Sequence, residues 1–105
     1  MSIKLSKIKD NNYDILFNDK VCGVVEYVEK NEGIKIESIS IKNIWKRKGI
    51  ATNIISELLQ KTNYIYGDCL PNNDSISFWS NVGAEFEEDV EECIKSNTCI
   101  PFSIN

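Results

Sequence analysis

The stretch GIKIESISIKNIWKRKGIAT, residues 33–52, holds a strand pattern that slips by one residue and then gives way to a basic segment. Isoleucines alternate with polar residues over 34–36 and again over 39–41, but the two runs are out of phase. Because alternate residues of a strand face opposite sides of a sheet, one extra residue around Glu37 and Ser38 predicts a β-bulge. Bulges often lie beside active sites, so this strand is a candidate for a functional position.

The basic segment that follows the strand precedes the predicted start of a helix. Lys46, Arg47 and Lys48 stand directly before Gly49. A helix start exposes unpaired N–H groups and the positive end of the helix dipole, and glycine lets an anion approach the backbone. The segment therefore indicates a phosphate site, with a solvated turn as the alternative. The glycine patterns of a P-loop and of a dinucleotide fold are absent, so neither ATP nor NAD is predicted.

The rest of the chain reads as strands and short helices. The helix after Gly49 has one apolar face, formed by Ile50, Ile54, Ile55, Leu58 and Leu59, and is expected to end near 61–63. Strand patterns cover 3–8, 13–18, 20–29, 64–70, 84–89 and 98–104, a second helix covers 74–83, 89–96 is a short helix or loop, and turns fall at 18–19 and 31–33. Pro101 predicts an edge position for the last strand. The order predicts a mixed α/β (α+β) fold with a central sheet and packed helices.

Composition limits the classes of protein and of chemistry. A chain of 105 residues with a net charge of −4 is predicted to form one domain, residues 1–105. It contains no histidine, which removes every Ser-His or Cys-His nucleophile pair. The cysteines show no C-x-x-C spacing, so free thiols are expected and a metal site is not; they are Cys22, Cys69, Cys93 and Cys99.

The distribution of charge and of apolar residues bears on partners. The basic residues are local and have no aromatic platform, so nucleic acid is not predicted. No apolar run suits a signal peptide or a membrane span, so we expect a cytoplasmic protein without membrane contact. The acidic run Glu85–Glu92 is either a solvated face or a rim that attracts a cationic partner.

Two motifs, in the right order, resemble those of the GCN5-related N-acetyltransferases (GNAT). The family's Arg/Gln-x-x-Gly-x-Gly/Ala motif is matched by residues 46–51, with lysine at the first position. Its N-x-x-A-x-x-F-Y-x-x-x-G-F pattern is matched in spacing by Asn72, Ser75, Phe78, Trp79, Gly83 and Ala84. The resemblance covers roughly residues 33–88. It implies a largely antiparallel sheet with helices on its faces, in an unusually short GNAT-like domain.

The resemblance also implies acetyl-coenzyme A as co-substrate and requires no metal. Backbone amides of 47–52 would cradle the pyrophosphate and the cations of 46–48 would meet its charge. The pantetheine arm would pair with the backbone of 39–41, and the bulge would splay this strand from that at 64–69 to make a slot for the thioester. The implied cofactor-binding residues are Ile39, Ser40, Ile41, Lys46, Arg47, Lys48, Gly49, Ile50, Ala51, Thr52, Asn72, Ser75 and Trp79.

The implied chemistry is direct attack of a primary amine on the thioester. Glu37 is the candidate general base, with a plain surface glutamate as the alternative. Trp79 occupies the position of the family's proton-donating tyrosine, and an indole is a poor proton donor. Tyr66, Asp68 or Cys69 could substitute as the acid, and each could equally be structural.

The N-terminal part departs from the family. GNAT proteins usually carry one or two helices between their first two strands, whereas residues 1–42 show only strand and turn patterns. An open thioester end favours a large acceptor, such as a lysine side chain on a protein. The alternative is a catalytically inactive coenzyme-binding or protein-interaction module with the same fold. Both a monomer and a homodimer remain open.

Overall fold

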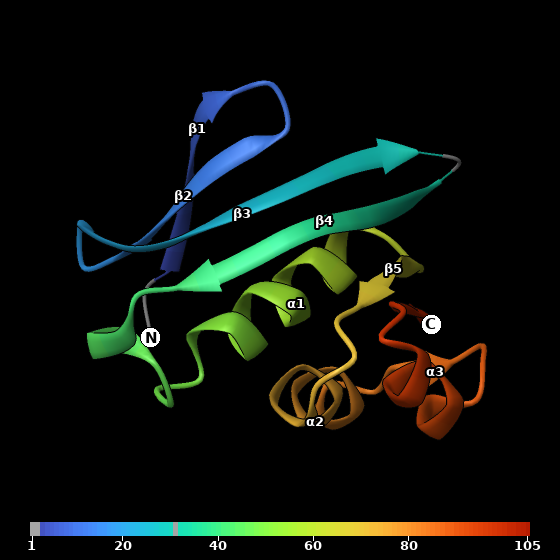
Figure 1. The fold of residues 1–105 in the computed structure, drawn as a ribbon. Helices are drawn as coiled ribbons and strands as arrows, with labels where there is room; N and C mark the ends of the chain where they lie inside the picture. Colours follow the sequence, from blue (N-terminus) through green and yellow to red (C-terminus); the bar gives the residue numbers. More distant parts are fainter. Residues whose placement is uncertain (1–2, 31) are drawn as a thin grey trace.

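The computed structural model describes residues 3–30 and 32–105, so residues 1 and 2, and residue 31 in the predicted second turn, lie outside it. The elements follow the chain as shown in Figure 1. They are β1 (Ile3–Lys9), β2 (Asn12–Phe17), β3 (Lys20–Lys30), β4 (Gly33–Ile41), one helical turn (Asn43–Trp45), α1 (Ile50–Lys61), β5 (Ile65–Cys69), α2 (Asn73–Asn81), β6 (Glu85–Phe86), α3 (Val90–Ser96) and β7 (Ile100–Ile104).

The strands form one seven-stranded sheet in the order β1-β2-β3-β4-β5-β7-β6. Among the described strands, only β4 and β5 pair in parallel, and every other neighbouring pair is antiparallel. The prediction of a mixed, largely antiparallel sheet is confirmed. Within the described part of residues 1–42, β1 to β4 follow one another through turns with no intervening helix.

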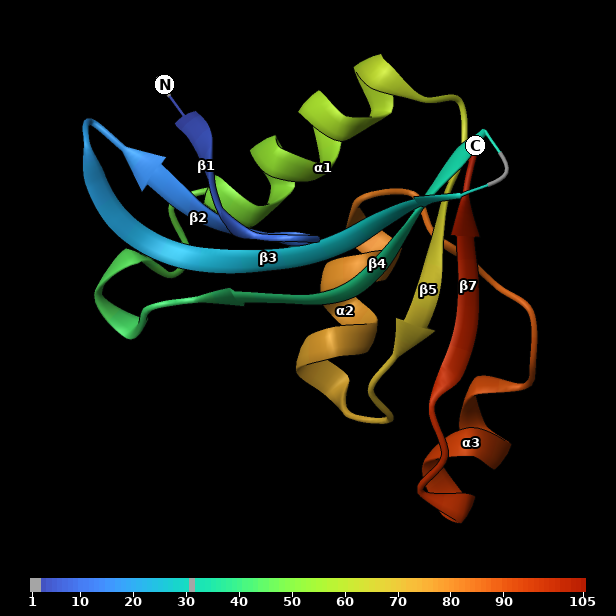
Figure 2. The same ribbon diagram turned by 90° about the horizontal axis from the view of Figure 1, so that it is seen from above.

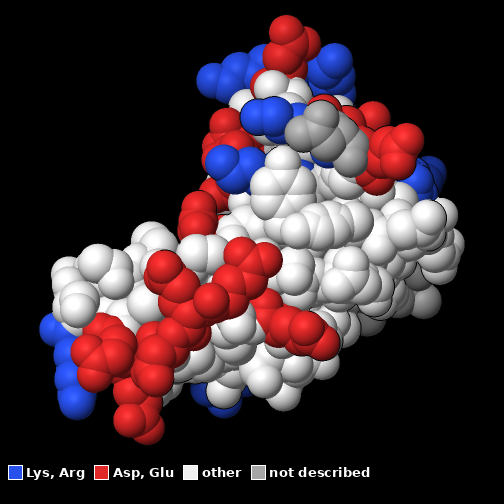
Figure 3. Space-filling model, turned by 90° about the vertical axis from the view of Figure 1, so that its right-hand side faces the viewer, with Lys and Arg blue, Asp and Glu red and all other residues white. Residues whose placement is uncertain are grey.

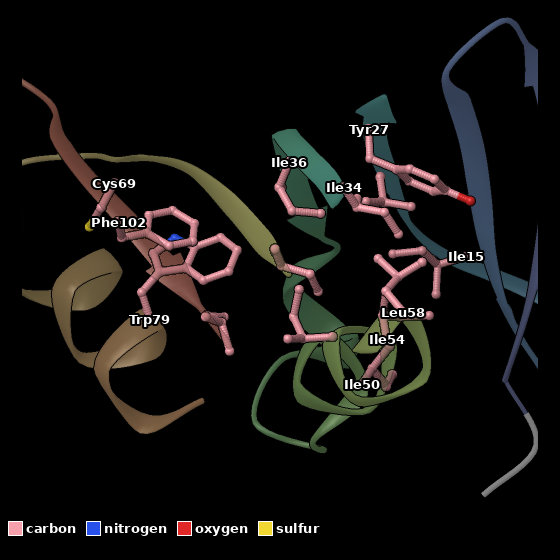
Figure 4. Close-up of a cluster of buried hydrophobic side chains, with 14 of the residues drawn as sticks. Ile15, Tyr27, Ile34, Ile36, Ile50, Ile54, Leu58, Cys69, Trp79 and Phe102 are labelled. Carbon is pink, nitrogen blue, oxygen red and sulfur yellow. The ribbon is translucent and has the colours of Figure 1, made fainter. Parts of the chain in front are cut away.

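The core lies on one face of this sheet. Side chains from α1, α2 and α3 join a single cluster of buried residues with the inward side chains of the strands. Figure 4 shows Ile54 and Leu58 of α1 pointing toward Ile15 of β2, and the Trp79 ring lying against Phe102. The two aromatic rings stack with centroids 4.2 Å apart. In Figure 1, α1 lies beneath β3 and β4, and no helix is drawn on the opposite side of these strands.

The predicted bulge is present in β4. Glu26 pairs with Ser38 and the next residue of β3, Tyr27, pairs with Ile36, which leaves Glu37 as the extra residue. The phase slip therefore changes which side chains face the core on either side of Glu37. The parallel pairing of β4 with β5 ends at Ile36, immediately before the bulge. Beyond it the two strands diverge, as Figure 2 shows, so the predicted splay is also confirmed.

The edge position predicted from Pro101 is wrong, because β7 lies between β5 and β6. The carbonyl oxygen of Pro101 accepts a hydrogen bond from the Glu87 amide at 2.9 Å. The N and C=O of one strand residue point to the same side, so the missing N–H of Pro101 also faces away from β5. The β5–β7 ladder loses no donor, and β7 pairs within its own sheet.

Two other boundaries differ from the sequence patterns. The strand predicted over 84–89 is only two residues long, since β6 pairs with β7 at Glu85 and Phe86 alone. Over 89–96, where the sequence pattern allowed a short helix or a loop, the structure has the helix α3, whose start is capped by Asp89. The Asp89 carboxylate accepts from the Glu92 amide at 3.1 Å, which satisfies one unpaired donor of the first turn.

Gly23→Ala is expected to destabilise the protein by about 3 kcal/mol. Gly23 is buried in β3, and a methyl group there would collide with the carbonyl oxygen of Ser40 and lie 3.1 Å from the Cα of Ile41. Both obstacles are backbone of β4, which can retreat only by loosening the β3–β4 ladder. Urea unfolding measures the change; a variant as stable as the wild type would contradict this close approach of the two strands.

Candidate functional site

A groove of about 640 Å³ runs between β4, the start of α1 and α2. It brings together most of the cofactor residues implied by the two motifs, although these residues come from three separate elements. The predicted residues that line it are Ile39, Ser40, Ile41, Lys46, Arg47, Gly49, Ile50, Ala51, Thr52, Ser75 and Trp79. Lys48, Asn72 and Glu37 do not line it.

Two further residues, Trp45 and Asp74, line the groove without having been singled out in the sequence. Trp45 is part of the stretch that precedes Gly49, and its ring packs against Phe17 at the end of β2 with centroids 5.6 Å apart. The sequence feature that could have indicated Trp45 is an aromatic residue directly before a run of cations. Asp74 lies in the first turn of α2, and only the position of α2 across the groove from the basic segment places it here.

The β4 wall offers free backbone groups to an extended ligand. The Lys42 amide donates to the Cys22 carbonyl of β3 at 2.8 Å, so Lys42 directs its N–H toward β3. Because this direction alternates along a strand, Ser40 also faces β3, whereas Ile39 and Ile41 direct their N–H and C=O groups away from it. Since β5 has already diverged, those groups face the groove, where a linear amide-containing chain could pair with them.

The start of α1 offers unpaired N–H groups. Gly49 is the N-cap residue, with φ 76° and ψ 13°, and no side chain caps the helix. The first intrahelical bond is donated by the Asn53 amide to the Gly49 carbonyl at 2.9 Å, so the amides of residues 50–52 have no partner within the helix. The side chains of Lys46 and Arg47 are exposed beside them. This end of the groove has the amides, dipole and cations that a phosphate ligand needs.

The α2 wall combines a helix cap with aromatic rings. The Asn72 side-chain oxygen accepts from the Ser75 amide at 2.9 Å and caps α2, which explains why this residue does not line the groove. Trp79 is only 7 % exposed and stacks on Phe102, so most of its indole belongs to the core. Phe78 lies beside it in an edge-to-face arrangement, with centroids 4.9 Å apart. The wall is therefore apolar at Phe78 and Trp79 and polar at Asp74 and Ser75, near the start of α2.

Glu37 lies at the mouth of the splay. It is the bulged residue and the first of β4 beyond the pairing with β5. Its carboxylate is exposed and lies 3.6 Å from the Lys35 ammonium. An ion pair this exposed contributes little to stability, so the carboxylate can exchange its partner at small cost.

The candidate proton donors have different surroundings. Tyr66 is half-buried, with its ring 5.3 Å from that of Tyr64, and Asp68 is exposed. Cys69 is fully buried, and its thiol donates to the Leu70 carbonyl at 3.2 Å. Burial, with a smaller contribution from neighbouring Cys99, raises the pKa of the Cys69 thiol. The thiolate form is therefore disfavoured, which argues against a covalent acyl-enzyme at this residue.

The part of the chain that the structure describes holds no cluster of three histidine, cysteine or acidic side chains that could bind a metal ion. None of the helices described is both long enough and apolar enough to cross a membrane.

Neither the protein-family models nor the curated proteins give a match to this sequence. Solved structures do resemble it. Arabidopsis thaliana Naa50, in complex with a bisubstrate analogue, has a TM-score of 0.68 at 21% identity over 91% of this chain and 73% of its own. A Bacillus subtilis acetyltransferase in complex with CoA has a TM-score of 0.75 at 11% identity over 98% of this chain and 97% of its own.

A GNAT family acetyltransferase of Elizabethkingia anophelis, with acetyl-CoA bound, has a TM-score of 0.68 at 10% identity, over 90% of this chain and 74% of its own. These similarities extend along almost all of the chain, although few residues are identical. The chain has the fold of the GCN5-related N-acetyltransferases.

Proposed function

We propose that this protein is an acetyl-coenzyme A-dependent N-acetyltransferase that moves an acetyl group to a primary amine. One observation carries the proposal: a single groove joins the uncapped start of α1 to the free edge of β4. The first end suits a pyrophosphate and the second suits the amides of pantetheine. Three proteins of the same fold that were solved with CoA, acetyl-CoA or a CoA-containing analogue support the same assignment.

Different residues of the groove would bind different parts of the coenzyme. The amides of 50–52 would bind the pyrophosphate, and the side chains of Lys46 and Arg47, which line the groove, would neutralise its charge. Ile39 and Ile41 would pair with the pantetheine amides through their backbone, while Ser75 and Trp79 would limit its movement on the α2 side. Asn72 would act through the start of α2, which it caps.

Bound acetyl-coenzyme A would supply the activated acetyl group as a thioester. The neutral acceptor nitrogen attacks the carbonyl carbon, a C–N bond forms and the C–S bond breaks. Glu37 takes the proton lost by the ammonium, directly or through a water molecule, and the departing thiolate takes a proton from solvent or from Tyr66. Positioning of the two reactants in the splay supplies the rest of the acceleration.

The acceptor we propose is an amine on a large partner, such as a lysine side chain of a protein. Within the described residues no helix stands between β1 and β2, so no such helix walls the thioester end into a small cavity. A large partner can therefore bring its amine to the splay without entering an enclosed pocket.

A coenzyme-binding module without turnover is the second candidate. The observation that favours it is the burial of Trp79 where the family's proton-donating tyrosine stands. Both candidates require coenzyme binding, and only the first requires Glu37.

Cys69→Ala is expected to retain acetyl transfer within about threefold of the wild type, because a buried thiol of raised pKa does not act as the nucleophile. The measurement is the rate of thiol release at saturating acetyl-coenzyme A, with the folded fraction checked by thermal unfolding. Loss of turnover in a folded Cys69→Ala variant, together with an acetyl group found on Cys69 in the wild type, would replace direct attack with a covalent mechanism.

The proposed function is tested by incubating the protein with acetyl-coenzyme A and a panel of amine acceptors that includes lysine peptides. Release of coenzyme A thiol and mass spectrometry of the acceptors report transfer. We expect enzyme-dependent N-acetylation of at least one acceptor. Coenzyme binding without transfer to any acceptor would favour the inactive module, and absence of binding would exclude both candidates.

A further inference from the structure

The face of the sheet opposite the helices is uncovered in the part of the chain that the structure describes. The buried strand residues, such as Gly67 and Phe102, share the face on which the helices pack. The residues that alternate with these buried ones along each strand point to the uncovered face. Tyr66 pairs with Ser103, and Ser103 pairs with Glu85, so these three side chains form one row on the uncovered face.

A second row lies beside the first. Asp68 pairs with Pro101, whose carbonyl accepts from the Glu87 amide at 2.9 Å. Asp68 and Glu87 therefore lie on the uncovered face too, as does Glu85, two residues before Glu87. Two strand spacings separate β5 from β6, so Asp68 lies about 10 Å from Glu87 across the sheet, and Glu85 lies about 7 Å further along β6. We call Asp68, Glu85 and Glu87 the acidic face.

The acidic face borders the mouth of the splay. The pairing of β5 with β4 ends at Gly67, so Asp68 is the first residue of β5 beyond it. On β4 the corresponding first residue is Glu37. A group that enters the splay from the uncovered side of the sheet would pass between these two carboxylates and have Glu85 and Glu87 to one side.

The acidic face is not neutralised. All three side chains are exposed, and none of them takes part in an ion pair within the described residues. Figure 3 shows acidic side chains gathered in a band across this side of the molecule, with few basic ones among them. An uncompensated negative surface raises the local concentration of cationic partners and steers them toward it.

We propose that the acidic face docks a basic segment of a partner protein and thereby delivers the acceptor lysine to the splay; this inference rests on the proposed function. The lysine nitrogen enters between Glu37 and Asp68. A second cation of the same segment contacts Glu85 and Glu87 on β6. An extended chain rises about 3.3 Å per residue, so a reach of about 10 Å places that cation roughly three residues from the acceptor lysine.

Two labelled peptides of equal length test the docking. Each holds one central lysine; the first has arginines three residues to either side, and the second has glutamates there. Fluorescence anisotropy measures binding at low salt, and mass spectrometry measures acetylation. The protein variants are Glu85→Lys/Glu87→Lys and a control of equal charge change, Glu29→Lys/Glu57→Lys. Glu29 and Glu57 are exposed, Glu29 pairs with the inward-facing Ile34 and Glu57 lies on α1, so neither belongs to the acidic face.

We expect the arginine peptide to bind and to be acetylated in preference to the glutamate peptide, with both effects weakened by salt. Glu85→Lys/Glu87→Lys should weaken binding roughly tenfold, whereas the control should change it less than threefold. Stabilisation by acetyl-coenzyme A should be the same in all three proteins, which shows that the coenzyme site is intact.

The outcomes separate two kinds of failure. Equal acetylation and equal binding of the two peptides would refute the docking while leaving the transferase intact. If the two double variants lost peptide binding equally, binding would depend on net charge alone, and the docking proposal would also be refuted. Selective, Glu85- and Glu87-dependent binding without any acetylation would support the docking surface and overturn the proposed function.

Discussion

Gly49→Asp is expected to abolish stabilisation of the protein by acetyl-coenzyme A while the fold is retained. Gly49 is exposed with φ 76°, and a Cβ there meets nothing within 4 Å. The substitution therefore costs only the strain of a left-handed residue, about 1 kcal/mol. Its carboxylate would stand at the start of α1, where the amides of 50–52 and the cations of 46–47 are proposed to bind the pyrophosphate. Negative charge at that point repels the ligand and competes for the same donors.

Thermal unfolding with and without the coenzyme measures this effect. A ligand at one hundred times its dissociation constant adds about 2.7 kcal/mol to the free energy of unfolding, and the variant should gain almost none of it. Gly83→Asp is the matched control, because Gly83 is also exposed with φ 96° and open space around its Cβ, but does not line the groove. The control should respond to the coenzyme as the wild type does. If acetyl-coenzyme A stabilised Gly49→Asp as much as the wild type, the start of α1 could not be the site that binds the pyrophosphate.

Glu37→Gln is expected to lower kcat by roughly 10²-fold or more, the contribution typical of a general base. The amide keeps the shape of the side chain but cannot take a proton from the acceptor ammonium. Because Glu37 lies at the mouth of the splay and not in the groove, stabilisation by acetyl-coenzyme A should be unchanged. Steady-state thiol release with a lysine peptide gives kcat, and thermal unfolding gives the coenzyme response.

Lys35→Gln is the control for Glu37→Gln. It removes the ammonium group 3.6 Å from the Glu37 carboxylate and leaves the carboxylate in place. A change of less than about fivefold is expected, since an exposed ion pair contributes little. If Glu37→Gln turned over as fast as the wild type, Glu37 would be a surface residue and another base would have to be found.

The bulge and the helix after it could be predicted because they depend on strict local periods. A phase slip between 34–36 and 39–41 leaves few strand geometries other than an inserted residue, and the structure places that residue at Glu37. The period of α1 was equally clear: Ile50, Ile54, Ile55 and Leu58 are all buried.

Features that depend on contacts between distant segments could not be predicted. Pro101 suggested an edge because the sequence predicts a strand near β6 but not that this strand pairs with β7 and lies outside it. Asp74 and Trp45 line the groove only because α2 and β2 pack where they do. The rows that place Asp68 beside Glu85 and Glu87 follow from the register of β5, β7 and β6, which a single sequence does not encode visibly.

A motif position also does not by itself give a side chain's role. Asn72 matches the family's motif, yet its side chain caps α2. Trp79 matches the position of the proton-donating tyrosine, yet it is a core residue stacked on Phe102. The contacts of Asn72 follow from the unpaired amides at the start of α2, and those of Trp79 follow from aromatic packing in the core.

The central claim is that one ligand occupies both ends of the groove, and amide NMR of the wild-type protein titrated with acetyl-coenzyme A tests it most directly. We expect saturable shifts in the amides of Gly49, Ile50, Ala51 and Thr52 and in those of Ile39 and Ile41, with those of Gly83 and Glu57 unmoved. Shifts confined to Gly49–Thr52 would reduce the site to an anion-binding turn. The absence of shifts at both ends in excess coenzyme would contradict the assignment of this groove to acetyl-coenzyme A.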